Sequence, residues 1–93
     1  MTRVIIETQN DFVLAAISNA VNAEIMLLQR SLARVREKIR HFETKYGHNA
    51  DRSALYGHID DMELLEWEGE IETADKLQNK LFSLEDIQIE ERR

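Results

Sequence analysis

Several residue types are missing or scarce in this chain of 93 residues, and each absence narrows what the protein can be. There is no cysteine, which excludes disulfides, thiolate metal ligands and cysteine nucleophiles. There is no proline, which, together with a charged fraction of 32%, favours long helices over collagen-like or proline-rich structure. The three glycines are not clustered, so the sequence has no glycine-rich phosphate-binding loop.

Long apolar runs are also scarce. No run of apolar residues approaches the ~20 needed to span a membrane, and the N-terminal Val4-Ile5-Ile6 run is too short for the core of a secretory signal. We therefore expect a cytoplasmic protein with no membrane partner. A chain of this length forms one domain with a thin core, and oligomerisation commonly supplements such a core.

The segment from Asp11 to Tyr46 organises the chain. Apolar residues recur in it at alternating spacings of three and four, with one polar break at Ser18. This series contains Leu14, Val21, Ile25, Leu28, Leu32, Val35, Ile39, Phe42 and Tyr46. The spacing predicts a helix about 54 Å long with a heptad seam, which a second helix must cover. Gly47 is expected to end this helix.

A second segment, from Asp61 to about Leu84, has the same spacing in Leu64, Trp67, Ile71, Ala74, Leu81 and Leu84, with a polar break at Gln78. The connection, residues 47–60, has room for one short helical turn between residues 49 and 57, with Leu55 and Tyr56 covering the tip. The chain is therefore predicted to be an all-α antiparallel helical hairpin, similar to a coiled coil. Gly69 costs this helix about 1 kcal/mol relative to alanine, which suggests that a bulky neighbour such as Phe42, Tyr46 or a partner's side chain needs the space.

The charges are segregated along the chain. Basic residues predominate from Arg30 to Lys45, and acidic residues occupy the stretch from Asp60 to Glu72, which contains no base. In a hairpin these blocks lie side by side, so a complementary pair of helices is the favoured interpretation. The net charge of −6 argues against a dedicated nucleic-acid binder, although contact of the basic strip with phosphate stays open.

The two ends have the composition of short strands. Residues 2–8 contain a β-branched run, and residues 86–91 alternate polar and apolar side chains. We expect extended tails that pair with each other or with the same tails of a second copy.

The lengths of the two helices predict an interface. The second helix, at ~36 Å, covers the first only from Tyr46 to about Val21, and the uncovered half is apolar on more than one face. An uncovered apolar surface usually marks an interface. We therefore predict a homodimer with a four-helix arrangement, or a bound partner protein, through Phe12, Leu14, Ile17, Val21, Ile25 and Leu28.

The acidic helix offers the strongest candidate for chemistry. Glu63, Glu66 and Glu70 occupy neighbouring turns, with His58 and two aspartates just before them. Carboxylates spaced in this way hold Mg²⁺ in helical bundles when facing helices also supply acids. The facing helix here supplies arginines and lysines, so a solvated acidic face is the favoured interpretation. We predict no catalytic, cofactor-binding or metal-ligating residue.

Part of the chain resembles a group of small helical proteins from archaea and cyanobacteria. The motif His41-Phe42-Glu43-Thr44-Lys45-Tyr46-Gly47 is similar to the "F-E-x-K-Y-G" that ends their first helix. Asp60-Asp61, Glu66-Trp67 and Leu84-Glu85-Asp86-Ile87 resemble their acidic loop, the opening of their second helix and its close. Some members look like antitoxins encoded beside a small toxin. The resemblance implies a non-enzymatic inhibitor whose acidic helix, at Glu63, Glu66 and Glu70, faces a small basic toxin.

Three hypotheses follow. The first is an interaction protein of the antitoxin type, which acts by stoichiometric inhibition. The second is a purely structural module that associates with itself. The third is a metal-dependent, all-α nucleotide hydrolase, which would need Mg²⁺ against Glu66 or Glu70.

Overall fold

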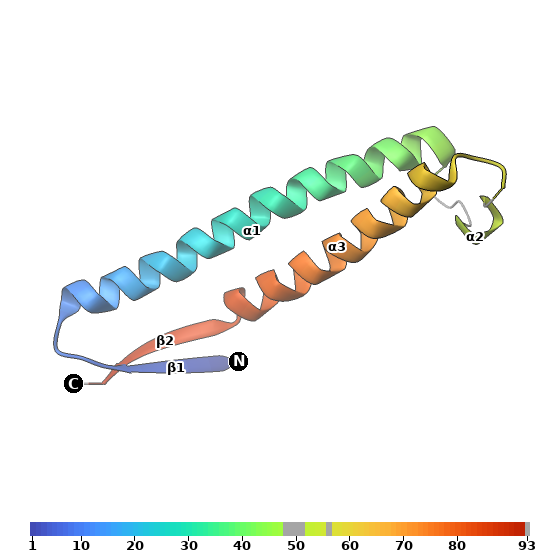
Figure 1. The fold of residues 1–93 in the computed structure, drawn as a ribbon. Coiled ribbons are helices and arrows are strands. Elements are labelled where there is room, and N and C mark those ends of the chain that lie inside the picture. Colours follow the sequence, from blue (N-terminus) through green and yellow to red (C-terminus); the bar gives the residue numbers. More distant parts are fainter. Residues whose placement is uncertain (48–51, 56, 93) are drawn as a thin grey trace.

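The computed structural model is an elongated helical hairpin whose two ends pair as strands, as Figure 1 shows. It describes residues 1–47, 52–55 and 57–92. In chain order the elements are β1 (Thr2–Glu7), α1 (Asp11–Tyr46), α2 (Arg52–Leu55), α3 (Asp61–Glu85) and β2 (Ile87–Arg92). The described part measures 63 × 20 × 18 Å. The predicted hairpin and its two extended tails are confirmed, and each of these elements begins and ends within one residue of its predicted bounds.

A side-chain cap starts helix α1, and the predicted glycine ends it. The Asn10 side chain accepts hydrogen bonds from the amides of Phe12 and Val13, at 3.0 and 3.2 Å. It thereby caps two amides that have no partner within the helix. Gly47 follows the last turn with φ 103° and ψ 145°, a conformation that glycine adopts without steric cost. Its amide closes the helix by donating to the Glu43 carbonyl at 2.7 Å.

Helix α3 is capped by Asp60, whose carboxylate accepts from the Met62 amide at 2.8 Å. The short helix α2 packs Leu55 near the start of α3, as expected for the tip of the hairpin. The other residue predicted to cover the tip, Tyr56, lies outside the described residues. The expectation that Gly69 makes room for Phe42 or Tyr46 is wrong, because a β-carbon there would meet none of the described residues within 4 Å, apart from its neighbours in the same helix.

The core between α1 and α3 is thin and divided in two. Near the tip, Phe42, Leu64 and Trp67 are buried together, and Tyr46, Leu55, Ile59 and Ile71 pack around them. Near the other end of α3, Leu28, Leu32 and Leu81 form a second cluster, bordered by Ile25 and Leu84. These six side chains are the buried apolar residues of the part of the chain that the structure describes. Each belongs to one of the two predicted seams.

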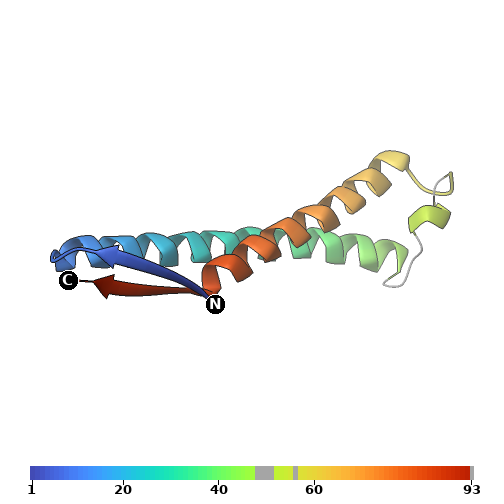
Figure 2. The ribbon, with the colours of Figure 1, turned by 90° about the horizontal axis from the view of Figure 1, so that it is seen from below.

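The ends form a two-stranded parallel ribbon. Thr2 pairs with Ile87, Val4 with Ile89 and Ile6 with Glu91. Parallel strands need a long crossover, and here the entire hairpin provides it. Figures 1 and 2 show the ribbon running beside the N-terminal half of α1, beyond the point where α3 ends. The tails therefore pair within one chain, which was one of the two predicted arrangements.

The charged blocks of the two helices meet as predicted. Lys45 in α1 lies 2.7 Å from the Glu63 carboxylate in α3, and Lys38 lies 3.4 Å from Glu70. Arg36 donates to Gln78 at 2.5 Å. Exposed ion pairs contribute at most about 1 kcal/mol each, so these pairs favour the antiparallel pairing of the helices more than they stabilise the fold.

Candidate interaction surface

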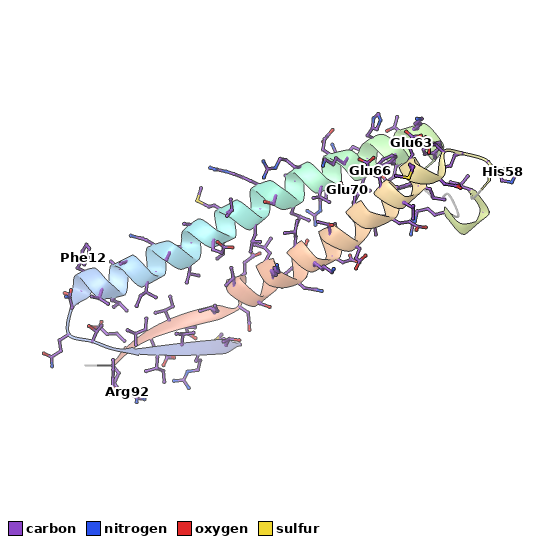
Figure 3. The ribbon with its side chains drawn as sticks, in the orientation of Figure 1. Phe12, His58, Glu63, Glu66, Glu70 and Arg92 are labelled. Atoms are coloured by element: carbon purple, nitrogen blue, oxygen red, sulfur yellow. The ribbon has the colours of Figure 1, made fainter. Side chains whose placement is uncertain are left out.

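Most residues of the predicted interface lie on the inner side of α1. Leu28 is buried in the core with Leu32 and Leu81. Leu14, Ile17, Val21 and Ile25 are half-buried on the same side of the helix. Phe12 is the exception: it is 79% exposed, and Figure 3 shows it on the side of α1 away from the strands. The chain itself therefore covers much of the surface on which the interface was predicted.

The ribbon supplies this cover. Val21 and Ile25 of α1 line a shallow pocket together with Leu84, Ile87 and Ile89. Side chains alternate between the two faces of a strand, so Ile87 and Ile89 share the face turned toward α1, and their register partners Thr2 and Val4 share it too. The opposite face of the ribbon carries Arg3 and Glu90, which form two hydrogen bonds of 2.9 and 2.6 Å.

A second apolar face of α1 stays uncovered. We call it the outer face and define it by Val13, Ala16, Ala20, Ala23 and Leu27, all of which are exposed. At 100° per residue these positions lie about 120° around the helix from the inner seam. Val13 is 39% exposed and Leu27 is 54% exposed, and Met26, at 52%, borders the face beside a shallow groove at Ala20, Ala23 and Leu27.

The sequence contains a signal for the outer face that the interface prediction missed. Its members recur at spacings of three, four, three and four, which makes a second heptad seam beside the inner one. Three of the five members are alanines, so the seam is less conspicuous than one built of leucine and valine. A helix with two seams has a place for two neighbours, and here the hairpin supplies one of them.

The acidic helix is partly engaged by its own hairpin. Glu63 accepts from Lys45 at 2.7 and 3.1 Å and also from the Tyr46 hydroxyl. The Lys45 ammonium, followed by the Tyr46 hydroxyl, holds the pKa of the Glu63 carboxyl below its ordinary value. The same carboxylate raises the pKa of Tyr46, because ionised tyrosine would lose this hydrogen bond. Figure 3 shows Glu63, Glu66 and Glu70 along the N-terminal half of α3, which lies beside the C-terminal half of α1.

The three glutamates do not converge with other acids. Glu66 is exposed and shares a shallow pocket with Lys38 and His41, both of which come from α1. His58 lies in the connection, apart from the glutamates, in Figure 3. Across the described ranges, no group of three or more histidine, aspartate or glutamate residues is arranged to hold a metal ion. The arrangement around α3 is a set of carboxylates beside cations, which suits electrostatic pairing.

By length and composition alone, α1 contains a window that is apolar enough to cross a membrane. Only 6% of that window is buried in the single chain. Comparisons with family models, with curated proteins and with solved structures found no match to this chain. The antitoxin-like resemblance therefore stays a prediction.

Proposed function

We propose that this protein is a non-enzymatic interaction module that associates with itself through the outer face of α1. The observation that carries the proposal is the exposure of large apolar side chains along one side of a single helix. Phe12, Val13, Met26 and Leu27 are all exposed there, while the inner side of the same helix is already covered by α3 and the ribbon. Exposed apolar patches of this kind usually mark protein interfaces.

The thinness of the core supports the same proposal. The described residues bury six apolar side chains, in two small clusters at different points of a rod 63 Å long. Pairing two rods through their outer faces gives each α1 a second helical neighbour, the α1 helix of the other copy. Such an arrangement is a common way for short chains to gain the buried area that a single copy lacks.

Inhibition of a basic toxin is the alternative that the family resemblance implies, and it would use α3. Two of the three predicted carboxylates, Glu63 and Glu70, already pair with Lys45 and Lys38 of the same chain. A partner would have to compete with these pairs or use the exposed Glu66. The geometry therefore favours self-association over the inhibitor role. It also favours self-association over the hydrolase, because Lys45 and Lys38 of α1 pair with Glu63 and Glu70, and the described residues hold no group of acids arranged to bind a metal ion.

Solution mass tests the proposal, and the chain offers a matched control. Leu27 on the outer face and Leu65 on α3 are both 54% exposed. We expect light scattering to give a dimer for the wild type, a monomer for Leu27→Glu and a dimer for Leu65→Glu. A wild type that stays at 10.9 kDa at every concentration would contradict the proposal. So would a Leu27→Glu variant that dimerises as well as the wild type.

A further inference from the structure

We propose that two outer faces pair in antiparallel orientation, with the two-fold axis passing between the levels of Val21 and Asn22. This inference rests on the proposed self-association and adds the direction and register of the pair. The occupant of the outer face is thus a second copy of this chain. A closed symmetric pair of this kind uses the same surface on both partners, so the surface must complement itself.

The distribution of charge along α1 has this self-complementary character. The outer face is apolar from Val13 to Leu27, and the same side of the helix continues with Arg30 and Arg34. The opposite end of the face lies at the start of α1, where Glu7 ends β1 and Asp11 opens the helix on its other side. In the antiparallel register, Arg30 comes level with residue 13 of the partner, and Arg34 comes just beyond the start of the partner's α1, at the end of the helix where Glu7 and Asp11 lie. Opposite charges at the two ends of the contact favour this orientation.

A parallel pair in register would place side chains of the same charge opposite each other. Arg30 would face Arg30, and Arg34 would face Arg34, at the basic end of the contact. Among the described residues neither arginine forms an ion pair within its own chain. No ion pair of these described residues would therefore offset that repulsion. Negative charge is likewise repeated in a parallel pair, where Glu24 would lie beside Glu24.

The sizes of the side chains fit the antiparallel register as well. Leu27 lies opposite Ala16, and Ala20 lies opposite Ala23, so the large side chain meets a small one and the centre holds only alanines. The groove beside Ala20, Ala23 and Leu27 begins at this centre and extends along the helix to Arg30. Facing large and small residues interdigitate, whereas a parallel pair would set Leu27 against Leu27 and Ala16 against Ala16 and pack unevenly.

The register also fixes the shape of the dimer. Residues 11–32 of the two copies overlap, and the tips of the hairpins point in opposite directions. The C-terminal ends of the two α1 helices, at Tyr46, then lie about 74 Å apart along the axis, at ~1.5 Å per residue. A parallel pair would keep both tips together and would be no longer than the single rod, which measures 63 Å.

Cysteine cross-linking tests the register without background, because the natural chain has no cysteine. We would place cysteines at Ala16 and Leu27 in one chain and oxidise it. The two positions are ~16 Å apart along one helix, too far for a bond within the chain, but they face each other in the antiparallel pair. We expect Ala16→Cys, Leu27→Cys to form a covalent dimer, at a yield about ten-fold above that of either single variant.

The outcomes separate the register from the proposed function. Cross-linking of Ala16→Cys alone, or of Leu27→Cys alone, would overturn the antiparallel register in favour of a parallel one. A dimer in light scattering that does not cross-link in the double variant would also overturn the register while leaving self-association intact. An equimolar mixture of Ala20→Cys and Ala23→Cys repeats the test with smaller changes of side chain, in case the Leu27 substitution weakens the pair. A monomeric wild type would reject the proposed function itself.

Discussion

The indole of Trp67 stacks on the ring of Phe42, with the ring centroids 5.8 Å apart and the planes inclined by 15°. This contact joins α1 to α3 near the tip of the hairpin. Because both rings are buried, we expect Phe42→Ala to lower the free energy of unfolding by about 3–5 kcal/mol. Chemical denaturation followed by circular dichroism measures this change, since substitution at Phe42 would itself alter the fluorescence of Trp67.

Phe12→Ala is the matched control for this prediction. It removes the same ring from a position that is 79% exposed. At concentrations where the protein is monomeric, the free energy of unfolding should change by no more than about 0.5 kcal/mol. Equal losses from the two substitutions would contradict the division of α1 into a covered inner side and an open outer side.

The Glu63 carboxylate gives the fold a predictable dependence on pH. Its pKa is lower in the folded chain than in the unfolded chain, chiefly because Lys45 and then Tyr46 donate hydrogen bonds to the ionised form. A carboxylate of this kind stabilises the fold above its unfolded pKa, and the stabilisation is lost as the pH falls through its folded pKa. Titration of the Glu63 carboxyl carbon by NMR should give a pKa below that of the same residue in a peptide.

The variant Glu63→Gln tests the same point by stability. It should be less stable than the wild type at neutral pH, and the difference should shrink in acid, where the wild type has lost its charge as well. Glu66→Gln, one turn along the same helix, is the control, because Glu66 is exposed and forms no ion pair among the described residues. A Glu63→Gln variant whose stability relative to the wild type is the same at every pH would contradict this account.

Gly69 should be replaceable with a gain in stability. The space around it is open, so alanine adds no clash and removes the flexibility of glycine from the middle of α3. We expect Gly69→Ala to raise the free energy of unfolding by about 0.5–1 kcal/mol. Gly47→Ala should do the opposite, because Gly47 has φ 103°. A loss of stability in Gly69→Ala would show that a neighbour outside the single chain occupies that space.

The ribbon should contribute to stability through one face only. Ile89 is half-buried and lines the pocket between the ribbon and α1, whereas its neighbour Gln88 is exposed on the opposite face. We expect Ile89→Ala to lower the free energy of unfolding by about 1–2 kcal/mol and Gln88→Ala to change it by less than about 0.5 kcal/mol. The same denaturation experiment measures both. Identical effects would mean that the ribbon does not pack against α1.

Helix positions could be predicted from the sequence because each depends on local chemistry. The alternating spacing of apolar residues predicted the two seams along which α1 and α3 pack. Asn10 and Asp60 have side chains suited to capping the start of a helix, and Gly47 suits the end of one. The pairing of the ends could not be decided in the same way. Residues 2–7 and 87–92 are separated by the whole hairpin, and only the folded length of α3 brings them together in parallel register.

Several residues of the predicted interface have partners within the chain, and the reason is physical. Leu14, Val21 and Leu28 belong to the inner seam. The length of α3 alone suggested that the N-terminal part of α1 would be exposed to solvent. The ribbon takes the place of α3 there, and β2 reaches Val21 and Ile25. That this half of α1 is apolar on more than one face was predicted, but the residues of the outer face were left out of the predicted interface, since a seam of small residues carries little of the hydrophobicity that identifies a core position.

Solvent access at two leucines tests the central claim most directly. In a single chain, Leu27 and Leu65 are equally exposed, at 54%. We would measure how strongly a soluble paramagnetic agent broadens their methyl NMR signals in the wild-type protein, at high and at low protein concentration. If the outer face of α1 binds a second copy, Leu27 will be protected at high concentration and will lose that protection on dilution, while Leu65 stays accessible throughout. Equal broadening of both leucines at every concentration would contradict the account.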